Sequence, residues 1–278
     1  MNILLTGATG FVGKNLIPTL QKDGHEVFVI VRPTTDISKI KLDNIFVFDG
    51  NVNDLAAYMR EKSIDGIIHL ASLYINKHEP NQINDLINSN ITFGTFLIQA
   101  ACQSGVKWFL NTGTIWQNYN VPPYSKQYCP VNLYAATKQA FIDIAKFYTE
   151  TSDLRFCTLK LCDTYGPNDT RRKIYSLFEE NSKSSDILRM SPGEQKIDLV
   201  HIDCVVEKFL LLAQKLNENK VLDSEYVVSS GVHKSLRQLA ADFEHEHHVK
   251  LHIEWGGLPY RQREVMIPYI GTRLFNDE

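Results

Sequence analysis

A glycine-rich segment near the start of the chain constrains its fold more than any other feature. Residues 6–13 read Thr-Gly-Ala-Thr-Gly-Phe-Val-Gly, after the apolar run Ile3 to Leu5 and before the helix-like stretch Asn15 to Leu20. This order of strand, glycine-rich turn and helix is typical of folds that bind a dinucleotide, because the free N–H groups that open the helix face its phosphates. The spacing is G-x-x-G-x-x-G rather than the commoner G-x-G-x-x-G, so a structural turn is the alternative.

The three glycines have separate tasks in such a turn. Without a Cβ, Gly7 can make the tight turn, Gly10 lets the backbone approach a pyrophosphate, and Gly13 lets the helix pack close to the strand. We therefore expect the cofactor to contact Gly7, Thr9, Gly10, Phe11, Val12 and Gly13.

Strand-like runs alternate with helix-length segments through the first half of the chain. This alternation predicts a parallel sheet with helices on both faces. The expected strands are Ile3–Leu5, Val27–Val31, Ile45–Phe48, Gly66–Leu70, Trp108–Leu110 and Phe156–Leu161, and two long helices are expected over Gln82–Ser104 and Leu133–Thr151.

The pattern changes beyond residue 161 to shorter elements, a Tyr-Gly-Pro turn and a charged stretch. The predicted fold class is therefore α/β: a Rossmann-type doubly wound parallel sheet with a smaller C-terminal substrate lobe. We expect a dinucleotide-binding domain over residues 1–161 and the smaller lobe over 162–278, with elements of the two able to interleave.

Composition excludes several classes of function. A net charge of −3 without a long Lys/Arg block disfavours nucleic acids and anionic membranes as partners. No apolar run approaches the length of a transmembrane helix, and no basic leader precedes the first strand, so we expect a cytoplasmic protein. The five cysteines form no C-x-x-C pair, and the His-rich stretch 245–248 matches no ligand spacing, so no disulfide framework or metal site is expected.

The end of the second strand bears on the choice of cofactor. In dinucleotide folds an acidic residue there accepts hydrogen bonds from the 2′-hydroxyl of NAD, but here the strand ends in Arg32. A guanidinium would instead pair with a 2′-phosphate, which favours NADP(H) over NAD(H). A solvated Arg is the alternative. Asn51, after the third strand, is expected to hydrogen-bond the adenine edge through its amide.

Tyr134 and Lys138 stand four residues apart at the start of the second long helix and so share one face. We expect Tyr134 to transfer a proton, its pKa lowered by the Lys138 ammonium. Thr112, at the end of the fifth strand, is expected to donate its hydroxyl to the substrate oxygen, and Thr114 is the alternative for that role. A second Tyr-x-x-x-Lys, at Tyr58, is interpreted as a surface coincidence because it follows the third strand instead.

Taken together, these motifs resemble the extended short-chain dehydrogenase/reductase family of the NAD-dependent epimerase/dehydratase type. The matching segments are Thr6–Gly13, Asn51, His69–Ala71, Asn90, Thr112 and Tyr134–Lys138. Tyr165-Gly166-Pro167, Gly193-Glu194-Gln195 with Asp198, and His201-Ile202-Asp203 are similar to the nucleotide-sugar branch of that family, and Asn88–Thr95 with Phe109–Thr112 are similar to sugar 4-ketoreductases of the CDP-abequose synthase type.

The resemblance implies a Tyr/Lys/Thr site over a nicotinamide and a nucleoside diphosphate held by the smaller lobe. It extends the expected cofactor contacts to Val52, Leu70, Ala71, Ser72 and Asn90. Many relatives carry an Arg where Ile197 stands, so other cations are expected near the diphosphate. The expected substrate-binding residues are Thr114, Asp163 (often Asn in relatives), Lys173, Lys196 and Arg261, with solvated charges as the alternative for the cations.

Three reactions compete within this resemblance. Dehydration is disfavoured, because Gly113 and Thr114 stand where dehydratases carry an Asp-Glu pair. Arg32 favours NADPH and hence reduction of the 4-keto group of a nucleotide-linked deoxy sugar, as in the deoxysugar biosynthesis of O-antigens. The alternatives are 4-epimerisation with retained NAD(P) and a non-catalytic dinucleotide-binding regulator. The apolar surface of the two long helices also suggests a homodimer.

Overall fold

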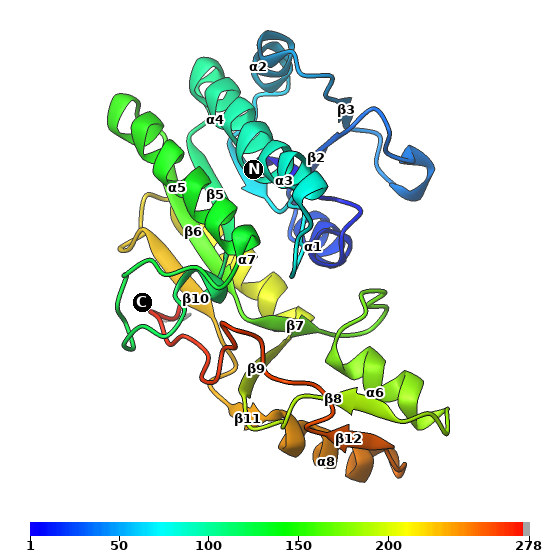
Figure 1. The fold of residues 1–278 in the computed structure, drawn as a ribbon. Coiled ribbons are helices and arrows are strands. Elements are labelled where there is room, and N and C mark those ends of the chain that lie inside the picture. The colour runs from blue at the N-terminus through cyan, green and yellow to red at the C-terminus, as the bar shows by residue number, and fades with distance from the viewer. Residues whose placement is uncertain (275–278) are drawn as a thin grey trace.

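The computed structural model describes residues 1–274, and of Lys39 only the backbone. Its centre is a sheet of seven parallel strands in the order β10-β6-β5-β4-β1-β2-β3 (Figure 1). This confirms the predicted fold class. The strands are β1 (Asn2–Thr6), β2 (Glu26–Val31), β3 (Ile45–Val47), β4 (Gly66–His69), β5 (Trp108–Thr114), β6 (Arg155–Leu161) and β10 (Glu225–Val228).

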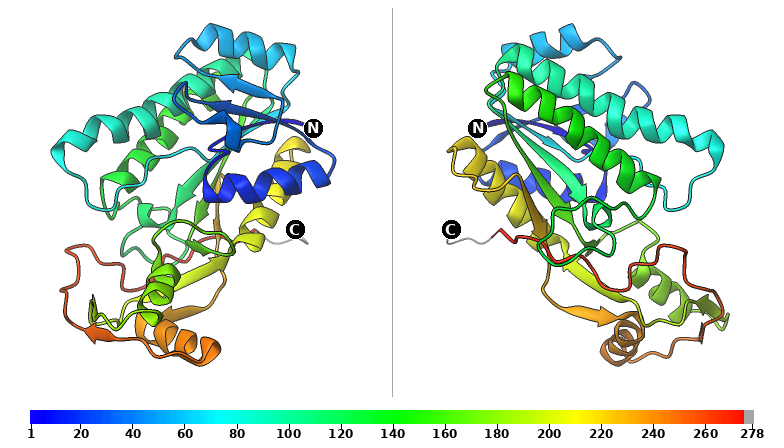
Figure 2. Two further views of the ribbon diagram at one scale, coloured as in Figure 1. Left: turned by 90° about the vertical axis from the view of Figure 1, so that its right-hand side faces the viewer. Right: turned by 60° about the vertical axis from the view of Figure 1, so that its left-hand side comes forward.

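Helices cover both faces of this sheet, as Figure 2 shows. The reason lies in the strands, where successive apolar side chains point to opposite faces. Ile3 and Leu5 of β1 belong to one apolar core and Leu4 to the other. The first core is covered by α1 (Phe11–Lys22) and α7 (Ile202–Asn217), and the second by α2 (Val52–Glu61), α4 (Phe93–Ser104) and α5 (Leu133–Thr151).

The long helix expected over residues 82–104 is a continuous helical run with a change of pitch. A π-helical turn, η3 (Asn88–Thr92), separates α3 (Ile83–Ile87) from α4. Such turns are common at functional sites and leave no trace in hydrophobic periodicity. Three short 3₁₀ segments complete the larger unit: η1 (Ile37–Lys39), η2 (Pro80–Gln82) and η4 (Ile115–Gln117).

The smaller lobe forms around two further sheets, of order β11-β9-β7 and β12-β8. Phe178, Leu239 and Phe243 lie in its separate apolar core. Its elements are β7 (Asp163–Tyr165), α6 (Ile174–Ser182), β8 (Leu188–Met190), β9 (Lys196–His201), β11 (His233–Ser235), α8 (Leu236–His247) and β12 (Ile253–Trp255).

The chain passes between the two units several times. β6 ends at Leu161 and β7 begins the smaller lobe at Asp163, but α7 and β10 then return to the large sheet. The segment after β12 also runs back from the lobe, and Arg273 pairs with Val227 of β10 (Figure 1). The predicted boundary at residue 161 therefore marks only the first crossing.

Two sequence features have simple structural counterparts. All five cysteines are free thiols, and Cys157 and Cys162 are buried. Among residues 1–274, no helix combines the length and apolarity needed to cross a bilayer.

Candidate active site

The glycine-rich turn joins β1 to α1 and is shaped for close backbone approach. Gly7 has a φ of +75°, and a Cβ there would lie 2.8 Å from the Ala71 nitrogen. A Cβ on Gly13 would lie 2.3 Å from the Gly7 carbonyl oxygen. The N-cap of α1 is Gly10, and no side chain caps the helix. The first N–H groups of α1 are therefore free to bind an anion, which fits the pyrophosphate of a dinucleotide.

A cavity of about 270 Å³ opens beside this turn at the carboxyl ends of the strands. It brings together many of the predicted site residues from distant parts of the sequence. Those that line it are Gly7, Gly10, Phe11, Val12, Gly13, Leu70, Ser72, Thr112, Thr114, Tyr134, Asp163 and Lys173. We refer to it below as the catalytic cleft.

Tyr134 and Lys138 lie on the first turns of α5, whose N-cap is Asn132. The Asn132 side-chain oxygen accepts a hydrogen bond from the Ala135 N–H at 3.0 Å, which fixes the start of the helix. Tyr134 faces the cleft, whereas Lys138 is buried one turn further on, with 3% of its surface exposed.

Thr112 lies near the end of β5, beyond the last residue that pairs with β4. Its Oγ1 is buried, and within residues 1–274 it has no hydrogen-bond partner. A buried hydroxyl without a partner costs free energy, so its position on the wall of the cleft indicates a ligand group as its partner. Thr114 differs, because its Oγ1 accepts a hydrogen bond from the Trp116 N–H and caps η4.

Burial dominates the protonation of Tyr134 and Lys138. It raises the pKa of Tyr134 to about 12, and hydrogen bonding to Ser72 acts in the opposite direction. It also lowers the pKa of Lys138 to about 8, because burial disfavours the charged form of each group. The phenol is therefore protonated at neutral pH, which is the form that can donate a proton.

Two of the predicted cofactor contacts have structural roles. Asn51 caps α2: its Oδ1 accepts from the Asn53 and Asp54 N–H groups, and its Nδ2 donates to the Asp54 carboxylate. The contact of this amide with adenine stays a prediction. Asn90 is buried and holds the segment after β4 to α5, through both backbone groups of Leu73 and the Thr137 hydroxyl.

The remaining predicted cofactor residues are not among those that line the cleft. Arg32 is exposed directly after β2, and Thr9 is exposed beside Gly10. Val52 is the first residue of α2 and packs against the core beneath it. The Ala71 N–H donates to the Thr6 hydroxyl at 3.0 Å, which fixes the segment that faces Gly7.

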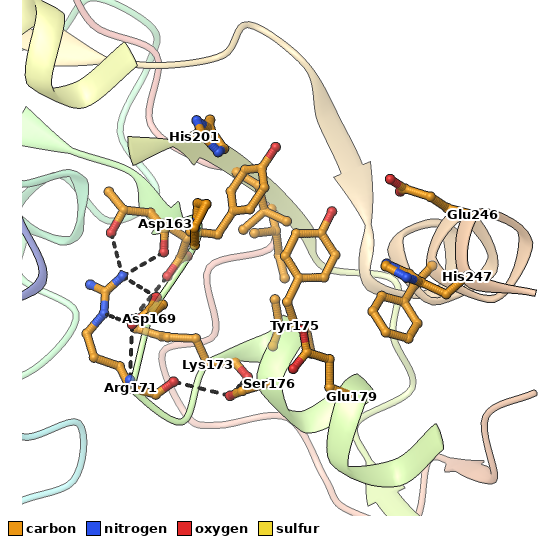
Figure 3. Close-up of a pocket in the computed structure, with 18 residues that line it drawn as sticks. Asp163, Asp169, Arg171, Lys173, Tyr175, Ser176, Glu179, His201, Glu246 and His247 are labelled. Carbon is orange, nitrogen blue, oxygen red and sulfur yellow. Dashed lines mark hydrogen bonds and ion pairs between the residues drawn. The ribbon is translucent and has the colours of Figure 1, made fainter. Parts of the chain in front are cut away.

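A second cavity, of about 420 Å³, lies in the smaller lobe between α6, α8 and β9 (Figure 3). It shares Asp163, Thr164, Arg171 and Lys173 with the catalytic cleft, so these four residues stand where the two cavities meet. The Lys173 ammonium lies 3.3 Å from the Asp163 carboxylate. A ligand that spans both cavities would pass this ion pair.

Lys196 lies on β9, where successive side chains alternate between the two sides of the strand. Ile197 and Leu199 face the second cavity, whereas the exposed Lys196 points away from it and lines neither cavity. Adjacent strand residues face opposite ways, so this position does not support the expected role of Lys196 near the diphosphate, which stays a prediction.

Arg261 lies on the segment that returns from the smaller lobe and is exposed. When the side-chain oxygen of Asn76 faces Arg261, it accepts hydrogen bonds from Nη1 at 3.0 Å and from Nη2 at 3.1 Å. Asn76 follows β4, so the pair bridges the two units close to Tyr74.

Two residues of the site were not found from the sequence. Tyr74 lines the catalytic cleft, with its ring edge-on to Tyr134 at 5.1 Å between centroids. The Lys173 ammonium lies 5.0 Å from the centroid of the same ring. Arg171 lines both cavities. Tyr74 belongs to no periodic pattern or motif. Arg171 stands in the charged stretch beyond residue 161, but nothing local distinguishes it there from Arg172.

The His-rich stretch lies at the end of α8. His247 lines the second cavity, while His248 is the C-cap of the helix in a left-handed conformation. Within residues 1–274, no group of three or more His, Cys, Asp or Glu side chains is arranged to hold a metal ion.

Comparison with known proteins shows what this chain is similar to. The model of the NAD dependent epimerase/dehydratase family matches residues 3–228. A CDP-abequose synthase from Salmonella muenchen is 28% identical over 275 residues, which are 97% of this chain and 89% of that protein.

Solved structures with much lower identity share the fold. A UDP-glucuronic acid 4-epimerase from Bacillus cereus, in complex with UDP-glucuronic acid and NAD, has a TM-score of 0.83 at 18% identity and covers 97% of this chain and 90% of its own. The dTDP-glucose 4,6-dehydratase DesIV from Streptomyces venezuelae, with NAD bound, has a TM-score of 0.80 at 19% identity and covers 97% and 88%.

Proposed function

The chain belongs to the NAD dependent epimerase/dehydratase family, and from this premise we propose that it reduces the 4-keto group of a nucleotide-linked deoxy sugar with NADPH. The observation that carries the proposal is the unpartnered Thr112 hydroxyl on the wall of a cleft that also holds Tyr134 and the glycine-rich turn. Similarity to a CDP-abequose synthase along nearly the whole chain supports a nucleotide-sugar substrate.

The residues of the cleft have distinct tasks in this reaction. A nicotinamide held beside the glycine-rich turn would supply a hydride for the carbonyl carbon. Tyr134, protonated because its pKa is about 12, donates a proton to the carbonyl oxygen, and Thr112 donates a hydrogen bond to the same oxygen as negative charge develops on it. Lys138, with a pKa of about 8, is largely protonated at neutral pH and stabilises the phenolate that the transfer leaves.

The substrate would extend from the cleft into the second cavity. Lys173 stands at the junction of the two, where the diphosphate of a nucleotide sugar would lie between its sugar and its nucleoside. Arg261 lines neither cavity but is the second candidate for the phosphates, because its exposed guanidinium lies beside Asn76, close to Tyr74, and can exchange the Asn76 amide for an anion. The second cavity, walled partly by Tyr165 and Tyr175, would receive the nucleoside.

The test is oxidation of NADPH, followed by nicotinamide absorbance, with a panel of CDP-, dTDP-, GDP- and UDP-linked 4-keto-6-deoxy and 3,6-dideoxy sugars. We expect one of them to be reduced by the wild-type protein and not by Tyr134→Phe, which removes the proton donor but keeps the ring. Turnover by Tyr134→Phe at the wild-type rate would reject the assigned role.

Epimerisation at C4 is the second candidate, because a 4-epimerase in complex with NAD shares the fold. An epimerase regenerates its cofactor in each cycle, so it would act on a nucleotide sugar without net loss of NADPH. Interconversion of two 4-hydroxy epimers by protein without added reductant would favour this candidate. If neither reaction occurs while dinucleotide binding is measurable, the regulator alternative gains support.

We further propose that two copies pair through α4 and α5. Phe147 on α5 is 62% exposed, and an exposed ring of this size on a long helix suits a helix–helix interface. A monomeric mass in solution at micromolar concentration would contradict the homodimer. The cytoplasmic location stays a prediction, which cell fractionation tests.

A further inference from the structure

Arg171 of the smaller lobe lies over the glycine-rich turn of the larger unit. Its guanidinium carbon is 4.2 Å from the centroid of the Phe11 ring, which directly follows Gly10 at the start of α1. These two residues are far apart in the sequence, and the contact places a cation beside the free N–H groups where a pyrophosphate is expected.

One edge of this guanidinium is firmly held. Nε donates to one oxygen of Asp169 at 2.7 Å and Nη2 to the other at 2.6 Å, while Nη2 also donates to the carbonyl and hydroxyl oxygens of Thr164 at 2.9 and 3.0 Å (Figure 3). This bidentate pairing fixes the plane of the group, because the two N–H donors match the two carboxylate oxygens.

The Nη1 group forms the other edge of the guanidinium. Within residues 1–274, no group accepts a hydrogen bond from Nη1 of Arg171. The side chain is 35% exposed, and it lines both cavities. The result is a pre-oriented cation with two unused donors at the border of the cofactor turn.

We propose that Arg171 is a pyrophosphate ligand and a latch on the bound dinucleotide. Its Nη1 edge hydrogen-bonds the pyrophosphate on the side opposite the α1 N-terminus, and the segment Gly166–Lys173 must move before the dinucleotide leaves. Asp169 is a positioning residue in this scheme. The inference rests on the proposed dinucleotide binding and adds a determinant of how long the dinucleotide stays.

Arg172 is a matched control for a change at Arg171. It is the next residue, carries the same charge and is 74% exposed, but its guanidinium pairs with Glu180 on α6. Removing it changes the net charge equally without touching the turn.

The experiment measures release of NADPH, and separately of NADH, from the full-length protein by stopped-flow nucleotide fluorescence after mixing with an excess of the oxidised form. We expect release from Arg171→Ala to be faster by about tenfold or more, since one or two charge-assisted hydrogen bonds are lost. Arg172→Ala is expected to release at the wild-type rate. The thermal unfolding midpoint of each unliganded variant shows whether the fold is intact.

Two further measurements separate a phosphate ligand from a structural residue. Arg171→Lys keeps the charge and should restore part of the slow release, whereas Arg171→Gln should not. The difference in release rate between wild type and Arg171→Gln should also narrow at about 1 M salt, because the Debye length falls to about 3 Å there.

Equal release from wild type, Arg171→Ala and Arg171→Gln would overturn the latch and leave the proposed function intact. A second outcome would also overturn the latch: Arg171→Gln releases the nucleotide faster than wild type, but high salt does not narrow this difference in rate and Arg171→Lys does not restore slow release. Arg171 would then have a structural role. If the folded wild-type protein binds neither NADPH nor NADH, the proposed function itself fails.

Discussion

Thr112 shows how one side chain can be positioned for chemistry rather than for stability. Its hydroxyl is buried at the cleft and has no partner within the described residues, whereas the hydroxyl of Thr114, two residues on, caps a helix. The sequence favoured Thr112 with Thr114 as the alternative, and the hydrogen bonds of the structure distinguish the two hydroxyls.

The variant Thr112→Val tests this distinction. It replaces the hydroxyl by a methyl group of similar size, so we expect the free energy of unfolding to change by less than about 0.5 kcal/mol, because no hydrogen bond is lost. We expect kcat to fall by about 10²-fold through loss of an oxyanion donor. Urea unfolding and steady-state kinetics measure the two effects.

Thr114→Val provides the comparison for Thr112→Val. Loss of a helix cap should cost about 1 kcal/mol of stability. A larger loss of kcat in this variant than in Thr112→Val would transfer the proposed role to Thr114.

The pKa of His69 gives a second residue-scale prediction. Burial, followed by the positive charge of Lys138, lowers the pKa of His69 to about 3 from 6.5 in the unfolded chain. Between these two pH values His69 is protonated in the unfolded chain and neutral in the folded one. The free energy of unfolding therefore decreases as the pH falls through that range. The loss is at most about 1.4 kcal/mol per pH unit.

His69→Gln removes this titration and can still hydrogen-bond the Thr6 hydroxyl, which lies 2.8 Å from the His69 Nδ1. Urea unfolding from pH 4 to 7 should therefore show a shallower dependence on pH for the variant than for wild type. Identical slopes would show that His69 does not contribute.

The proposed preference for NADPH depends on Arg32, which is exposed directly after β2. We expect wild type to bind NADPH more tightly than NADH, and Arg32→Ala to narrow the ratio about tenfold by losing the pairing with a 2′-phosphate. Titration of intrinsic fluorescence with both nucleotides measures the ratio, and Arg172→Ala should leave it unchanged. Equal affinities in the wild-type protein would contradict the preference for NADPH.

At the scale of elements, the packing of α1 on β1 depends on glycines without a Cβ. In Gly13→Ala the new Cβ would lie 2.3 Å from the Gly7 carbonyl oxygen, so α1 must shift away from the turn. We expect a loss of about 1–3 kcal/mol in stability, as for an overpacked core, together with loss of dinucleotide binding.

Gly24→Ala is the control for that shift. Gly24 has a φ of +78° and open space around it, so an alanine there should cost about 1 kcal/mol of backbone strain and leave dinucleotide binding unchanged. Normal binding in Gly13→Ala would show that the close approach of α1 is not needed for the site.

At the scale of the whole molecule, the proposed substrate must contact both units at once. Lys173 belongs to the smaller lobe but lines the cleft beside residues of the large sheet, where it pairs with Asp163. We expect Lys173→Ala to raise KM for the nucleotide sugar about tenfold with little change in kcat, since it contacts the substrate away from the reacting carbon.

Lys196→Ala shows whether a rise of KM in Lys173→Ala comes from a lost contact or from the change in net charge. Lys196 lies on the other side of β9, so its loss should leave KM unchanged. An equal rise of KM in both variants would mean that general attraction, rather than a contact at the junction of the cavities, holds the diphosphate.

Much of this protein was predictable because the decisive signals are local. Backbone geometry over a few residues fixes a glycine-rich turn between a strand and a helix, and it places a Tyr and a Lys four residues apart on one face of a helix. The order of the strands then favoured Tyr134 and Lys138 over the same spacing at Tyr58 and Lys62. Alternation of apolar strands and helices likewise determined the parallel sheet, which must bury both faces.

Tertiary structure alone decided what distant residues do to one another. Only packing could place Arg171 over Phe11, bring Lys173 to the junction of the two cavities, or bury Tyr134 so that its pKa rises. These properties depend on which groups surround a side chain and how much water remains there, and neither is encoded in local spacing. The sequence by itself therefore determined the fold class and the candidates for the reacting groups. The tertiary structure decided the burial and the partners of those side chains, because both come from distant parts of the chain.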